Sequence, residues 1–194
     1  EEALLRVSIP YRIYGGLRFY ERLEIKNAIA YLRIIFNNND NPSFERSISN
    51  PTRGVGEKTL AKIRQAAKKY NISYIKASAK LIDEGSISGR GGSGLKDYLE
   101  FVAGCKGFIE DNTLSDLMEL IIKETGLYAY HAKEAGEKGK TRTENLEELI
   151  TATKNFEQSI KDDRTNIEIA ESYLDIISLA VSYTHLRAHE TSRY

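Results

Sequence analysis

Pro51-Thr52-Arg53-Gly54-Val55-Gly56-Glu57-Lys58-Thr59 is the stretch on which the interpretation of the fold depends. Two glycines, one residue apart, follow a proline and lead into an amphipathic run, which predicts a tight hairpin that feeds a helix. Glycine at both positions would permit positive φ and leaves no Cβ between the backbone and a partner. The first N–H groups of the next helix are unpaired and suit an anion such as a phosphate. An ordinary corner between two helices remains the alternative.

The charge around this hairpin is basic, although the whole chain is neutral. The 194 residues include 28 basic and 28 acidic side chains. Residues 43–70 contain seven basic and two acidic residues, a local +5, whereas residues 134–171 contain six basic and ten acidic residues, a local −4. This asymmetry indicates that the hairpin region faces a negatively charged partner. A solvated helix face is the simpler alternative.

Three separated blocks of sequence carry a family resemblance. The blocks are IPYRIYGGLRFYERLEIKNAIAYLRII (9–35), FERSISNPTRGVGEKT (44–59) and GEKGKTRTENLEELITATKNF (136–156). In this order and spacing they resemble the UvrD/PcrA/Rep family of superfamily 1 DNA helicases, from Glu1 to about Ala180. The family's usual Gly-Ile-Gly appears here as Gly54-Val55-Gly56, which keeps a β-branched apolar residue in the middle.

The resemblance implies a mainly α fold in two parts. Residues 1–37 would be part of a RecA-like motor domain called 2A, with the end of a helix, a strand at Ile9–Tyr14 and a helix at Tyr20–Phe36. Residues 38–180 would be an all-helical insertion called 2B, with a helix–hairpin–helix-like element. The polar tract Asn37–Pro42 predicts the boundary loop. Residues 181–194 resemble the translation of a sequencing-library adapter, and we expect them to be non-native.

The resemblance also implies a set of DNA-binding residues. Main-chain N–H groups, hydroxyls and one guanidinium would hold a duplex phosphate, from Thr52, Arg53, Gly54, Val55, Gly56, Lys58 and Thr59. Such contacts position a duplex but do not read its sequence. Arg18 falls in a block that matches a 2A motif and is carried over as a phosphate contact. A structural turn is the alternative for the preceding Gly15-Gly16.

The function that the resemblance implies is the duplex-binding and regulatory part of a bacterial, cytoplasmic, ATP-dependent 3′–5′ DNA helicase in repair and replication restart. The chain has no G-x-x-x-x-G-K-[ST] loop and no acidic Mg²⁺ box. We therefore expect no catalytic residue, metal ligand or cofactor here, and assign ATP and Mg²⁺ to the parent helicase. The expected partners are double-stranded DNA at the single-strand/duplex junction and the remaining motor domains, with no membrane.

Two other classes of function remain open. One is a standalone helix–hairpin–helix module that binds DNA. The other is a protein-interaction domain that docks a partner on the acidic helix Glu144–Phe156. Cys105 is the single cysteine, so no intramolecular disulfide can form and a reducing cytoplasm is favoured. Its apolar neighbours predict a core position.

Apolar stripes and capping signals predict the remaining helices. The predicted helices are Phe44–Ser49, Glu57–Tyr70, Ser73–Ile82, Leu95–Ile109, one behind a capping box at Thr113–Asp116, Leu146–Phe156 and Ile167–Ala180. Gly89–Gly94 fits G-x-G-x-x-G, but no strand precedes it, so a flexible lead into the next helix is favoured over a dinucleotide site. Ala135–Thr143 is predicted to be a polar, mobile connector.

Overall fold

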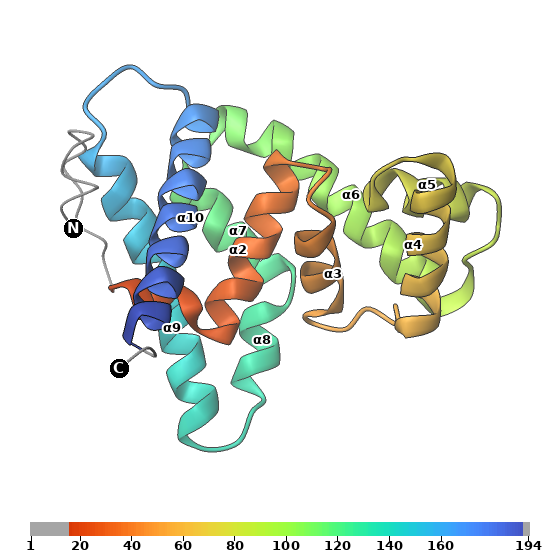
Figure 1. Ribbon diagram of the computed structural model, residues 1–194, viewed down its shortest axis with the longest axis horizontal. Coiled ribbons are helices and arrows are strands. Elements are labelled where there is room, and N and C mark those ends of the chain that lie inside the picture. The colour runs from red at the N-terminus through yellow and green to blue at the C-terminus, as the bar shows by residue number, and fades with distance from the viewer. Residues whose placement is uncertain (1–15, 192–194) are drawn as a thin grey trace.

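Helices follow one another along the computed structural model, which describes residues 16–191 (Figure 1). The helices are η1 (Leu17–Glu21, a 3-10 helix), α2 (Leu23–Phe36), α3 (Asn41–Ser49), α4 (Glu57–Tyr70), α5 (Tyr74–Asp83), α6 (Gly89–Asp111), α7 (Leu114–Glu124), α8 (Leu127–Ala132), α9 (Glu137–Ser159) and α10 (Asn166–Thr191). No strand occurs within 16–191, so the mainly α class is confirmed. The predicted strand at Ile9–Tyr14 lies outside the described residues.

α2 lies at the centre of the hydrophobic core. Its Ile25, Leu32 and Ile35 are fully buried, and the helix packs against α3, α6, α7 and α9. The predicted division near residue 37 would therefore separate two helices, α2 and α3, that pack against each other, and this division stays a prediction. Cys105 is also buried, as predicted, and burial raises the pKa of its thiol to about 12.

Local sequence signals set several helix ends as predicted. The Asp116 N–H donates to the Thr113 hydroxyl over 3.2 Å, and the Thr113 N–H donates to the Asp116 carboxylate over 3.0 Å. The predicted capping box at the start of α7 is thereby confirmed. Asp40 caps α3 by accepting the Ser43 N–H over 2.9 Å. The polar loop is therefore shorter than predicted, because α3 already begins at Asn41.

Two glycine-containing segments are helical, contrary to the sequence-based prediction. Gly89–Gly94 forms the first turns of α6 and is not a flexible lead, and most of Ala135–Thr143 forms the start of α9. Glycine has a low helix propensity, but here it makes room for close packing. A Cβ on Gly139 would overlap the carbonyl oxygen of Glu134. Tertiary contacts therefore outweigh the propensity.

The start of α6 lies directly on the hairpin that precedes α4. A Cβ on Gly91 would stand 2.9 Å from the carbonyl oxygen of Gly54, and a Cβ on Gly94 would overlap the carbonyl oxygen of Arg53. Any larger residue at Gly94 would have to push the helix and the hairpin apart. The glycines of α6 therefore fix where the hairpin sits.

This packing yields a first prediction. Gly94→Ala should lower the free energy of unfolding by about 1–3 kcal/mol, the usual cost of overpacking a tight contact, as measured by chemical denaturation. Gly104→Ala in the same helix is the matched control, because a Cβ there meets nothing within 4 Å. It should leave stability unchanged or raise it by up to about 1 kcal/mol, because alanine is the better helix former. Equal denaturation midpoints for both variants would contradict the close contact.

Candidate nucleic-acid interface

The hairpin Pro51–Gly56 joins α3 to α4 along one edge of the molecule (Figure 1). Gly54 has φ 74°, a left-handed conformation that favours glycine. Gly56 has φ −96° and ψ −179°, which is extended backbone that any residue adopts. The prediction of positive φ therefore holds for Gly54 and is wrong for Gly56. The side chain of Val55 is buried between them and anchors the hairpin in the core.

The start of α4 presents its N–H groups without a side-chain cap. Gly56 is the N-cap and accepts the N–H groups of Thr59 and Leu60 with its carbonyl oxygen, each over 3.0 Å. A Cβ on Gly56 would meet no atom within 4 Å, so the space beside this helix end is open. Thr52 and Lys58 are exposed nearby, and Thr59 is half-buried. An exposed helix start with hydroxyls and a cation suits an anionic ligand.

Arg53 is held by the protein itself. Its guanidinium donates to the carbonyl oxygen of Pro51 over 2.9 Å and to that of Thr125, at the end of α7, over 3.0 Å. The same group lies over the rings of Tyr31 and Tyr98, at 5.6 and 5.9 Å from their centroids. The side chain predicted to reach DNA thus links the hairpin to α2, α6 and α7. The contact of Arg53 with DNA, predicted through its guanidinium, stays a prediction.

Part of the predicted basic surface is also neutralised within the protein. Arg64 contacts the carboxylate of Glu45 over 2.6 Å and that of Glu57 over 2.5 Å. The bond from Arg64 lowers the pKa of Glu45, and the two carboxylates raise the pKa of Arg64. Lys62 donates to the carbonyl oxygen of Ser86 over 3.0 Å. By contrast, Lys58 is exposed and no described contact pairs its ammonium.

A cavity of about 550 Å³ opens beside the hairpin. Its wall is made by Pro51, Thr52, Arg53, Arg90, Ser93, Gly94, Asp97, Glu124 and Thr125. Asp97 and Glu124 bring two carboxylates to this wall, and the guanidinium of Arg53 is already bonded to main-chain carbonyls. A phosphate would therefore meet acidic groups inside the cavity, so the exposed hairpin is the better anion site.

Arg18 lies on a different element from the other predicted contacts. It is exposed on η1, which packs on α10 and α2. Figure 1 shows η1, in red, well away from α4. The structure thus brings residues 52–59 together and places Arg18 elsewhere. Gly15, the first residue of the turn before η1, lies outside the described residues.

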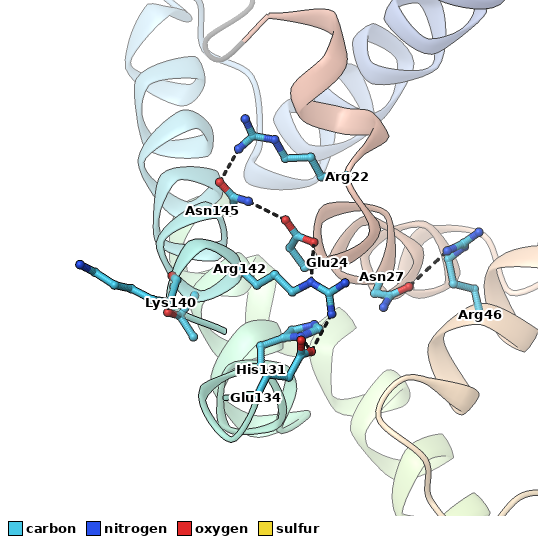
Figure 2. Close-up of polar contacts among 10 residues, drawn as sticks. Arg22, Glu24, Asn27, Arg46, His131, Glu134, Lys140, Arg142 and Asn145 are labelled. Atoms are coloured by element: carbon cyan, nitrogen blue, oxygen red, sulfur yellow. Dashed lines mark hydrogen bonds and ion pairs between the residues drawn. The ribbon is translucent and has the colours of Figure 1, made fainter. Parts of the chain in front are cut away.

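A second polar cluster is buried where α2 meets α9 (Figure 2). Glu24, in the first turn of α2, is 4% exposed. Its carboxylate accepts the side-chain amide N–H of Asn145 over 2.6 Å and lies 3.7 Å from the guanidinium of Arg142. Arg22 donates to the other side of the Asn145 amide. A buried carboxylate needs such partners, since burial without them is costly.

The same cluster continues into α8 (Figure 2). Arg142 donates to Glu134 over 2.6 Å, and the Nδ1 of His131 lies 2.7 Å from the same carboxylate oxygen. These contacts, that of His131 first, lower the pKa of Glu134. The cluster therefore links α2, α8 and α9 through buried polar contacts. No local sequence pattern marks this cluster, although the block 136–156 that carries the resemblance contains two of its members.

Comparison of the sequence with known proteins finds DNA helicases. A family model described as "UvrD-like helicase C-terminal domain" matches residues 1–87. The chain is 44% identical over 163 residues to DNA helicase II of Escherichia coli, which covers 84% of this chain and 23% of that protein. It is 40% identical over 193 residues to DNA helicase II of Haemophilus influenzae, which covers 98% of this chain and 26% of that protein.

A third relative comes from another bacterium. The ATP-dependent DNA helicase PcrA of Leuconostoc citreum is 32% identical over 180 residues, which cover 92% of this chain and 24% of that protein. The chain thus spans about a quarter of the length of these relatives. Among the described helices, none is long and apolar enough to cross a membrane. By its sequence and by these relatives, the chain belongs to the UvrD/PcrA-like superfamily 1 DNA helicases, as one region of such a protein.

Proposed function

We propose that this chain is the duplex-binding and regulatory 2B portion of an ATP-dependent 3′–5′ DNA helicase that acts in repair and replication restart. The hairpin and the start of α4 hold the phosphate backbone of double-stranded DNA near its junction with the single strand. ATP and Mg²⁺ are bound by other parts of the parent protein, which is a cytoplasmic ATP hydrolase. The remaining motor domains of that helicase are the protein partners.

The observation that carries this proposal is the exposed, uncapped start of α4 behind the extended Gly56. The first main-chain N–H groups of α4 lie here, Thr52 and Thr59 are exposed and half-buried in the adjoining hairpin and first turn, and Lys58 adds an exposed charge. All of these groups contact phosphate without distinguishing bases. A helicase must grip a duplex of any sequence, so contacts of this kind fit the task.

Rigidity of the support is the second argument for this proposal. Val55 is buried, Arg53 is bonded to two carbonyl oxygens, and α6 lies in close contact with the hairpin. The backbone that would face the phosphate is therefore held in place before DNA arrives. Such preorganisation reduces the ordering cost of binding.

A second prediction tests this site with fluorescently labelled duplexes of mixed sequence. Binding should be weak and independent of sequence. The logarithm of affinity should fall with the logarithm of salt concentration with a slope near −3, because about three to four phosphates are contacted at roughly −0.9 each. Gly56→Val should fold normally, since a side chain fits there, but its branched Cβ should shield the N–H groups and weaken binding about tenfold or more, as a lost charge-assisted contact does.

Gly107→Val is the matched control for that experiment. Gly107 lies near the far end of α6, and a Cβ there also meets nothing within 4 Å. This variant should bind duplex like the parent chain. If Gly56→Val is folded by circular dichroism and binds as tightly as Gly107→Val, the hairpin is only a corner between helices and the proposal fails.

A third prediction separates the role of Arg53 from that of Lys58. Arg53→Ala should lower the free energy of unfolding by about 2 kcal/mol, because hydrogen bonds from a charged donor to two carbonyl oxygens are lost. Lys58→Ala should leave the denaturation midpoint unchanged and flatten the salt slope by about 0.9, because it removes one phosphate contact. Unfolding curves and duplex titrations on both variants decide the matter. If Arg53→Ala instead flattens the salt slope and leaves stability unchanged, while Lys58→Ala does not change the slope, Arg53 contacts DNA.

A further inference from the structure

If an arginine contacts a phosphate at the hairpin, the structure favours one other than Arg53. The guanidinium of Arg53 is directed into the protein, where Thr125 and two tyrosine rings surround it. Phosphate recognition by two parallel N–H bonds is a property of the planar guanidinium, which a lysine does not reproduce. A phosphate at the hairpin would therefore need a second arginine near Gly54 whose guanidinium is not already bonded within the protein.

Arg90 meets this requirement from a separate element. It is the second residue of α6 and is exposed. Its Cγ lies 3.0 Å from the place where a Cβ on Gly54 would stand, and its carbonyl carbon and oxygen lie 3.4 Å from that place. The stem of Arg90 thus runs across the hairpin at Gly54. Within residues 16–191, no described ion pair or side-chain hydrogen bond engages its guanidinium.

The glycines of α6 explain how Arg90 reaches this position. Gly91 lets the helix approach the carbonyl oxygen of Gly54, and its Cβ position also lies 3.9 Å from the hydroxyl of Thr59 in the first turn of α4. The first turns of α4 and α6 therefore lie together at the hairpin. Arg90 directly precedes Gly91, and Lys58 directly precedes Thr59. The segment that resembled a dinucleotide motif serves to seat Arg90 beside the phosphate site.

We propose that Arg90 supplies the guanidinium that contacts the duplex phosphate held by the hairpin, the role that the family resemblance implied for Arg53. This inference rests on the proposed function and names a further binding residue for it. The acidic groups Asp97 and Glu124 lie with Arg90 on the wall of the neighbouring cavity. They repel the duplex from that side, so the phosphate meets Arg90 from the side of Lys58.

A salt titration of duplex binding tests this fourth prediction. With a slope near −3, the affinity of the parent chain should fall about 60-fold between 50 and 200 mM salt. Arg90→Gln keeps most of the stem and removes the charge. Its slope should be flatter by about 0.9, so that its affinity falls only about 20-fold over the same range. Arg90→Lys should restore the parent slope with weaker binding, since the charge returns without the two-pronged geometry.

Lys106→Gln is the matched control, because Lys106 is exposed on the same helix, about 24 Å along its axis from Arg90 at 1.5 Å per residue. It should keep the parent slope and affinity. If Arg90→Gln shows the same salt dependence of duplex affinity as the parent chain, the inference is wrong. It is also wrong if affinity is lost with an unchanged slope and a lower melting temperature, which would show that the stem of Arg90 only packs on the hairpin.

The two proposals fail in different ways in this experiment. If Gly56→Val loses duplex binding while Arg90→Gln titrates like the parent chain, the hairpin binds DNA and only the role of Arg90 is wrong. If the parent chain itself does not bind duplex, the proposed function fails and the role of Arg90 fails with it.

Discussion

The close approach of α6 to the hairpin is the constraint on which the candidate interface depends. Gly94 allows the helix to touch the carbonyl oxygen of Arg53, and Gly91 does the same for Gly54. Neither contact is compatible with a side chain. Two segments about 40 residues apart in sequence are thereby held together, and the start of α4, the hairpin and the start of α6 form one surface. The cost of placing glycines in a helix, about 1 kcal/mol each, is offset by this packing.

Arg53 connects that surface to the rest of the molecule. Its guanidinium spans the distance between the hairpin and the end of α7, over the rings of Tyr31 and Tyr98. Tyr98 in turn shares a 2.6 Å hydrogen bond with Ser47 of α3. A half-buried cation held between aromatic rings and carbonyl oxygens is a strong internal contact. A charge that resembles a ligand contact in the sequence thus fastens the candidate interface to the end of α7.

The other half of the molecule is organised by the buried cluster around Glu24. Arg142 stands between the carboxylates of Glu24 and Glu134, and so ties the first turn of α2 to α8 and α9. Removing one member would leave a buried charge without its partner, which costs more than the pair contributes. Gly139 allows α9 to pass close to the carbonyl oxygens of His131 and Glu134, in the same way that the glycines of α6 accommodate the hairpin. Close backbone contacts at glycines thus accompany both the Arg53 contacts at the hairpin and the buried cluster around Glu24.

The sequence by itself determined the mainly α class, the family and the positions of most helices. Its apolar stripes and capping residues act over three or four positions, which is why α4 and the capping box of α7 were predicted correctly. Only the tertiary structure decided the direction of Arg53 and the helical state of Gly89–Gly94. Each depends on contacts between residues far apart in the chain, such as Arg53 with Thr125, and no local pattern records them. Propensity predicted loops at the glycines because it cannot include the neighbouring backbone that only glycine can approach.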